Sequence, residues 1–207
     1  METKDIKVRI TFIEELLGTA AADPEIHRTY IGGLAPDAQS TEEEVASLGV
    51  DEVVENAMSV FSRDENDKPV LWDYQIKGLF KDACSMLGRL KGMTESAQIK
   101  AYKKIIDGLI FIFPRKIPII FEGKVGSCQR PLRASTAQGE RITLANSETV
   151  PAGSYIDVTI KLLDQSLKTA VLEWLKYGRL RGLGQWRNSG KGRFNFEILE
   201  ESKEKAA

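Results

Sequence analysis

The 207-residue chain has little of the side-chain chemistry from which metal centres and histidine-based active sites are built. It contains two cysteines, Cys84 and Cys128, and a single histidine, His27. Two cysteines do not make a disulfide framework or a zinc site, and one histidine does not supply a metal cluster. We therefore expect neither a metal nor a cofactor.

Long apolar segments are also missing. No apolar run approaches the roughly 20 residues that span a bilayer, and the opening METKDIKVRI lacks the apolar region of a signal peptide. We therefore expect a cytoplasmic protein with no membrane partner. With 42% hydrophobic and 29% charged residues, the composition is typical of one globular domain, here over residues 1–207.

Basic residues are scarce in the first third of the chain and acidic residues are scarce near its C-terminal end, although the formal net charge is only −1. Residues 1–67 carry 16 acidic and 5 basic residues, whereas the remainder carries 14 acidic and 24 basic residues. The segment from Lys176 to Arg193 holds six basic residues and no acidic one. Such a local positive surface attracts polyanions in spite of the neutral sum.

The hydrophobic periodicity predicts an α+β fold. In the first part of the chain it predicts a strand through residues 6–12, a helix with an apolar stripe from 76 to 87, a polar helix at 96–104, and short strands at 109–113 and 117–121. In the second part it predicts a hairpin of 141–150 with 154–162, a helix at 165–177 stopped by Gly178, and a last strand at 194–198. Residues 129–138 have no clear period and are expected to be a loop or an irregular strand. Residues 20–67 are expected to be an acidic insertion, and residues 200–207 a frayed tail. This order favours a ferredoxin-like or RNA-recognition-type antiparallel sheet with helices on one face.

The most informative motif is the segment Gly182–Gly192, GLGQWRNSGKG, which has four glycines in eleven residues. Glycine lets backbone N–H groups approach a phosphate closely, and Arg187 and Lys191 add positive charge. The alternative is a helix C-cap followed by a tight turn with solvated cations. The dinucleotide-binding and P-loop patterns do not fit, because their glycines follow a strand and open a helix, whereas these follow a helix.

This segment resembles the C-terminal glycine-rich loop of the repeat-associated mysterious protein (RAMP) superfamily, the RNA-binding subunits and processing nucleases of CRISPR systems. Two Gly-x-Gly pairs around a five-residue spacer with a basic residue match at Gly182, Gly184, Arg187, Gly190 and Gly192. Three other segments are similar to the family in the same order: KVRITFIEELLGTA to its first strand, QIKGLFKDA to its basic helix entry, and SETVPAGSYIDVTI to the hairpin before its last helix. Residues 23–67 match no motif of the family. Its members commonly carry a thumb-like insertion in that region.

The resemblance implies a role in antiviral defence, with RNA bound along its phosphate backbone by a ferredoxin-like domain. In backbone subunits of the effector type, copies polymerise head to tail along a guide RNA beside other effector subunits. The implied RNA contacts are Gln75, Lys77, Gly78, Lys81, Arg181, Gly182, Gly184, Gln185, Trp186, Arg187, Asn188, Gly190, Lys191 and Gly192. Trp186 would either stack on a base or pack against the last helix.

The residues themselves add a second basic segment, in which Arg130 and Arg133 either extend an electropositive groove or belong to a solvated loop. A metal-independent endoribonuclease is an alternative to simple RNA binding. Its general base or acid would be His27, which is otherwise a surface or capping residue. Asp23 either resembles the target-cleaving aspartate of some backbone subunits or caps a helix before Pro24. A stand-alone, phage-encoded interaction or decoy protein, or a small-nucleotide binder, is the third possibility.

Overall fold

A computed structural model describes residues 2–21, 58–90, 92–136 and 139–205 of the chain. The backbone forms two compact units. Unit 1 consists of residues 1–16, 63–123 and 151–207, and unit 2 of residues 17–62 and 124–150. Most of the expected acidic insertion, including His27 and Asp23, lies outside the described residues.

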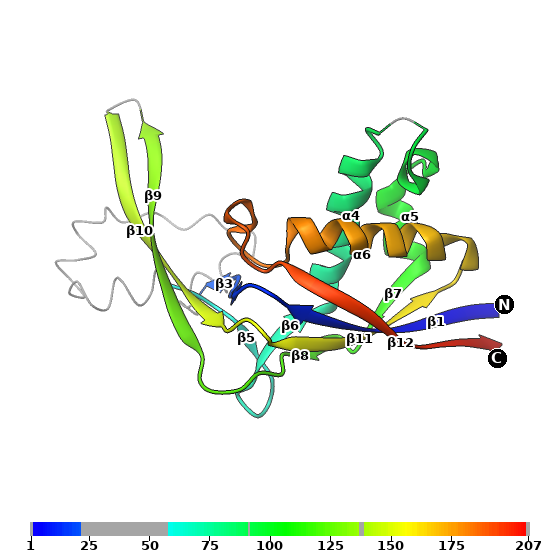
Figure 1. The fold of residues 1–207 in the computed structure, drawn as a ribbon, viewed down its shortest axis with the longest axis horizontal. Helices are drawn as coiled ribbons and strands as arrows, with labels where there is room; N and C mark the ends of the chain where they lie inside the picture. Colours follow the sequence, from blue (N-terminus) through cyan, green and yellow to red (C-terminus); the bar gives the residue numbers. More distant parts are fainter. Residues whose placement is uncertain (1, 22–57, 91, 137–138, 206–207) are drawn as a thin grey trace, which may run out of the picture. The chain divides into compact units, whose positions relative to one another are not determined.

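A four-stranded antiparallel sheet forms the centre of unit 1. Its strands are β1 (Glu2–Phe12), β7 (Ile110–Phe113), β11 (Tyr155–Leu162) and β12 (Phe194–Lys205), in the order β12-β1-β11-β7. The helices α4 (Asp73–Leu87) and α6 (Lys168–Arg181) cover one face of this sheet (Figure 1). The α+β class with antiparallel sheets and helices is thereby confirmed.

The core of unit 1 lies between this sheet and its helices. Alternate residues of β11, from Ile156 to Leu162, are buried, because successive strand side chains point to opposite faces. Phe80 of α4 packs against Trp174 of α6 with ring centroids 5.4 Å apart. The indole N–H of Trp174 donates to Ser96 Oγ at 2.9 Å, so this large buried ring leaves no polar atom unsatisfied.

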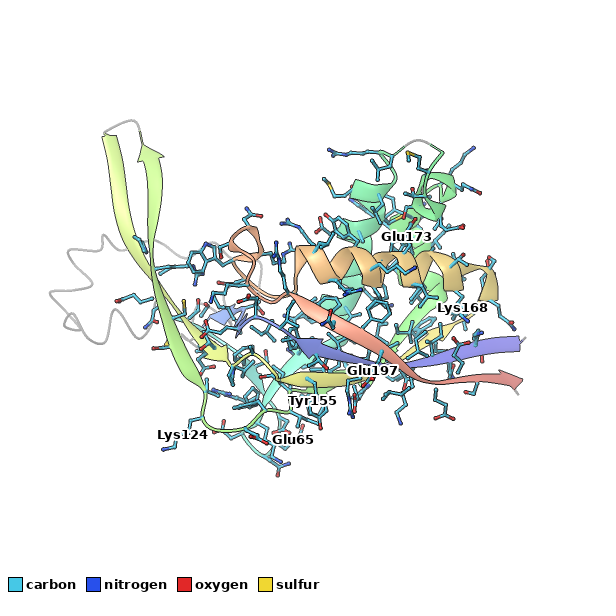
Figure 2. The ribbon with its side chains drawn as sticks, in the orientation of Figure 1. Glu65, Lys124, Tyr155, Lys168, Glu173 and Glu197 are labelled. Carbon is cyan, nitrogen blue, oxygen red and sulfur yellow. The ribbon has the colours of Figure 1, made fainter. Side chains whose placement is uncertain are left out.

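Two smaller groups of elements complete unit 1. The first is the 3₁₀ helix η1 (Glu95–Gln98) with α5 (Tyr102–Leu109), of which η1 is held by Glu173, labelled on α6 in Figure 2. The Glu173 carboxylate accepts hydrogen bonds from the backbone N–H groups of Glu95 and Ser96. The second is a three-stranded sheet in the order β5-β6-β8, formed by β5 (Ser62–Arg63), β6 (Pro69–Trp72) and β8 (Lys116–Pro118).

Unit 2 contains a second sheet. Its strands are β2 (Leu16–Leu17), β3 (Ala20–Ala21), β4 (Ser59–Val60), β9 (Gly126–Thr136) and β10 (Gly139–Val150). β9 and β10 form a long antiparallel hairpin, paired from Gly126–Thr149 to Thr136–Gly139. The side chains of Ser59 and Ser147 share a hydrogen bond of 2.6 Å where β4 meets β10.

The hairpin of unit 2 decides one expectation and corrects another. Residues 129–138, expected to be a loop or an irregular strand, lie largely in the regular strand β9, and 141–150 pairs with β9 instead of with 154–162. Residues 155–162 form β11, which pairs with β1 and β7. Periodicity did not reveal β9 because its polar sequence carries no alternation, while its backbone hydrogen bonds come from β10.

Three helix and strand boundaries also differ from expectation. The expected helix at 96–104 is divided into η1 and α5 by Ala101, which has a left-handed φ of 51°. α6 continues past Gly178 to Arg181 and is capped by Gly182, whose φ is 81°. The tail expected to fray from Glu200 instead continues β12 to Lys205, because β1 supplies pairing partners along that length.

Gly178 lies inside α6 because β12 approaches the helix closely there. A Cβ atom at this position would lie 2.5 Å from Phe194 Cζ and 3.0 Å from Leu79 Cδ2. Phe194 is fully buried and packs edge to face on Phe12, so its ring has little room to retreat. Glycine at this site serves the packing of helix on sheet and not the end of the helix.

We predict that Gly178→Ala lowers the free energy of unfolding by about 1–3 kcal/mol through overpacking. Gly78→Ala is the matched control, since a Cβ there meets nothing within 4 Å on the exposed side of α4. It should raise stability by about 0.5–1 kcal/mol, because alanine costs less backbone entropy in a helix. Urea unfolding followed by tryptophan fluorescence measures both, and equal effects of the two changes would contradict the packing argument.

Candidate nucleic-acid interface

The glycine loop, defined as residues 182–192, connects α6 to β12 and is closed at its base by backbone contacts. The N–H of Leu183 donates to the carbonyl of Gly192 at 2.9 Å, and the N–H of Gly192 donates to the carbonyl of Glu15 at 2.8 Å. A Cβ on Gly192 would overlap the carbonyl oxygen of Leu183, and one on Gly182 would lie 2.5 Å from that of Lys191. Both glycines are therefore required by close backbone approach, as the tight-turn interpretation expects.

The tip of the loop is a short turn that faces solvent. Trp186 has a left-handed φ of 53°, the 3₁₀ helix η3 (Arg187–Ser189) follows, and Gly190 has a φ of 88°. The Ser189 hydroxyl donates to the Trp186 carbonyl at 2.9 Å, which fixes the turn. The Trp186 side chain is 39% exposed and Asn188 is exposed, so both side chains reach solvent at the tip.

Carboxylates hold the cations of the loop. Arg181 Nε and Arg187 Nη1 both donate to Asp82 Oδ2 at 3.1 Å, and Lys191 Nζ donates to Glu15 Oε2 at 2.7 Å. The other end of the Arg181 guanidinium donates to Asn188 Oδ1 at 2.8 Å. The loop is thus fastened to α4 and to the end of β1, and any phosphate that binds these cations competes with two carboxylates.

The expected contacts at the start of α4 are also engaged within unit 1. Gln75 Oε1 accepts the backbone N–H of Trp72 at 2.7 Å, which caps the helix. Lys81 pairs with Asp107 of α5 at 2.7 Å, and the ammonium of Lys77 lies 4.9 Å from the ring centroid of Phe111. Gly78 is exposed with open space around it. The helix entry therefore joins α4 to α5 and β7.

Arg130 and Arg133 belong to β9 in unit 2. The Arg130 side chain is buried and its Nη1 donates to Ser147 Oγ at 2.9 Å. For Arg133, the structure describes the backbone, which pairs with Ile142 of β10. The described backbone of this segment therefore forms a strand and not the solvated loop that was one of the two expectations.

An aromatic pair at the start of α4 was missed by the sequence analysis. Tyr74, 60% exposed, stacks on Trp72 with ring centroids 6.1 Å apart and an angle of 14° between the planes. The cationic groups of Arg115 and Lys116 each lie 5.9 Å from the Trp72 ring centroid. In the sequence, the two aromatic residues close together at the start of a helix could have indicated this pair. The approach of the two cations could not be predicted, because it depends on the pairing of β6 with β8.

Metal-ligating and thiol side chains are the next candidates for a reactive site in the described parts of the chain. Over residues 2–21, 58–90, 92–136 and 139–205, no three His, Cys, Asp or Glu side chains are grouped to hold a metal ion. Burial raises the pKa of the Cys84 thiol, which keeps it protonated and poorly nucleophilic at neutral pH. Within the same ranges, no helix is long and apolar enough to cross a membrane.

We predict that Asp82→Ala loosens the glycine loop, because one carboxylate holds both Arg181 and Arg187. Each partly exposed ion pair contributes about 0–1 kcal/mol and two are lost, so hydrogen exchange of the loop amides should accelerate by up to about thirtyfold. Exchange measured by mass spectrometry tests this. Asp107→Ala is the control, since it removes an equal charge that pairs with Lys81; equal acceleration in both variants would contradict the assignment.

The fold has a counterpart among solved structures. No protein-family model and no curated protein matches the chain. One chain of a structure described as "Cryo-EM structure of the Type III-B Cmr-beta bound to cognate target RNA" matches with a TM-score of 0.54 and 13% sequence identity. The match covers 100% of the present chain and 62% of the solved one. At this identity the likeness concerns the fold, and the chain spans less than two thirds of that neighbour's length.

Proposed function

We propose that the protein binds RNA as a RAMP-type subunit, of the kind that forms the backbone of a CRISPR effector. The observation that carries this proposal is the basic glycine loop between the last helix and the last strand of unit 1. Its tip presents an indole and an amide to solvent, and three cations lie in or beside it. A groove that combines positive charge with aromatic faces is how proteins bind single-stranded nucleic acid.

The fold supports the same proposal. In unit 1 the elements β1, α4, β7, β11, α6 and β12 follow one another as strand–helix–strand–strand–helix–strand, and the last strand lies beside the first. This order is that of the ferredoxin-like fold, which we assign to unit 1. The solved neighbour belongs, by its description, to an RNA-bound Type III-B complex. A RAMP-type subunit would have both properties.

Binding would proceed by exchange of ionic partners. In the free protein Asp82 and Glu15 hold the loop cations, which keeps the charges in place before RNA arrives. A phosphodiester would replace a carboxylate as acceptor for the Arg187 guanidinium and the Lys191 ammonium. Trp186 would stack on a base, a contact of about 1–3 kcal/mol. Phosphates and stacking carry no sequence information, so recognition would be sequence-independent.

The proposed partners are RNA, further copies of the chain and other effector subunits in the cytoplasm. Copies that add head to tail through unlike surfaces make open filaments, and the separation of acidic residues 1–67 from the basic remainder suits such contacts. No enzymatic step is proposed. An endoribonuclease, a decoy protein or a small-nucleotide binder would each give a different outcome in the experiment below.

We predict that Arg187→Gln/Lys191→Gln weakens binding of single-stranded RNA at least tenfold at 0.1 M salt, because two phosphate contacts are lost. Glu15→Gln should strengthen binding by about two- to fivefold, since it removes the carboxylate that competes for Lys191. Fluorescence anisotropy of labelled RNA measures both affinities. Glu200→Gln, which removes one exposed charge far along β12, is the matched control and should change the affinity by less than twofold.

Several results would contradict the proposed function. They are the absence of RNA binding by the parent protein, and equal binding by the parent and the double variant. Gel analysis of the same RNA after incubation tests for cleavage, and shortened products lost in His27→Ala would favour an endoribonuclease. Saturation by a mononucleotide in place of RNA would favour a small-nucleotide binder.

A further inference from the structure

A shallow depression beside the glycine loop has the character of an anion site. It lies in unit 1 and has a volume of about 410 Å³. Its lining comes from the end of β1, the last turns of α6 and the start of β12, and consists of Ile13, Lys176, Arg179, Leu180, Arg193 and Asn195. Three of these six residues are cationic and none is acidic.

The charges of this depression, unlike those of the loop, have no carboxylate partner among the described residues. The Arg179 guanidinium donates from Nε to Asn195 Oδ1 at 3.2 Å. The Arg193 guanidinium donates from Nε to the carbonyl of Leu180 at 3.1 Å. Both acceptors are neutral, and in both cases the terminal Nη groups donate to no described residue. Lys176 is exposed and forms no ion pair within the described chain.

We infer that this depression is the principal phosphate-binding subsite of the RNA surface, an inference that rests on the proposed function. A phosphate there meets uncompensated positive charge, whereas at Arg187 or Lys191 it must displace Asp82 or Glu15. The guanidinium fork matches phosphate oxygens in geometry. The subsite continues the loop, since Arg193 follows Gly192 directly and its Nε lies 3.6 Å from a Cβ position at Gly190.

The apolar rim favours a nucleotide chain over a small anion. Leu180 is 73% exposed and Ile13 is 48% exposed, and both line the depression together with its cations. A free phosphate ion gains nothing from such side chains. RNA alternates phosphates with riboses and bases, whose apolar faces can cover Leu180 and Ile13.

Helix stability offers a simpler account of part of this charge. Cations near the C-terminus of α6 interact favourably with the helix dipole, and the Arg193 contact to the Leu180 carbonyl satisfies a terminal acceptor. The test therefore leaves Arg193 intact. Lys176 and Arg179 are exposed, and glutamine preserves helix propensity at both positions.

The experiment compares Lys176→Gln/Arg179→Gln with Lys103→Gln/Lys104→Gln, an equal charge change on the exposed side of α5. RNA affinity is measured by anisotropy at several salt concentrations. The inference expects at least tenfold weaker binding for the first variant and less than twofold for the second. The slope of log affinity against log salt should become shallower by about 1.4, since each lost single-strand phosphate contact removes about 0.7. Unchanged unfolding curves would separate the effect from helix stability.

Four outcomes overturn the inference. If the parent binds RNA and both variants match it, the depression is not the subsite, although the proposed function stands. If the parent binds no RNA, both fail together. If inorganic phosphate competes with RNA at millimolar concentration, and Lys176→Gln/Arg179→Gln lowers the affinity for phosphate but not for RNA, the depression is a small-anion site. A change of sedimentation without a change of RNA affinity would mark a protein contact.

Discussion

The backbone contact between Leu183 and Gly192 is the constraint on which the rest of the candidate interface depends. It leaves no space for a side chain at Gly192 and brings the last turn of α6 against the start of β12. Because the same glycine donates to the carbonyl of Glu15, the end of β1 joins the closure. The cations of α6 and of the loop, together with Arg193, are thereby gathered on one part of unit 1, although they are distributed over eighteen positions in the sequence.

Charge in this region is divided into two classes with different consequences. Arg181, Arg187 and Lys191 are held by Asp82 and Glu15, so their positions are set by ion pairs, and in the proposed function they would bind RNA by exchange of these partners. Arg179 and Arg193 donate to neutral acceptors and keep their field. Charges of the second class contribute most to attraction at long range, since a paired cation has little net field. Ordered positions and unneutralised charge together suit a backbone-binding surface.

The sequence allowed a correct prediction of the α+β class and of the elements with strong periodicity. β1, β11 and α6 alternate or repeat apolar residues clearly, because each packs one side on the core. The sequence did not allow prediction of the pairing of β9 or of the Asp82 contacts, since these depend on partners distant in the chain. The basic run from Lys176 to Arg193 was visible, but only the structure distinguishes its paired from its unneutralised cations.

Ultraviolet crosslinking of a uridine-rich single-stranded RNA to the protein, followed by tryptic digestion and mass spectrometry, tests whether RNA binds at the glycine loop. Binding there predicts nucleotide adducts on the peptide Gly182–Arg187, which carries the exposed Trp186, and on the peptides that flank it. Crosslinks confined to other parts of unit 1 or to unit 2, or their absence in a protein that retains its native fluorescence, would contradict it.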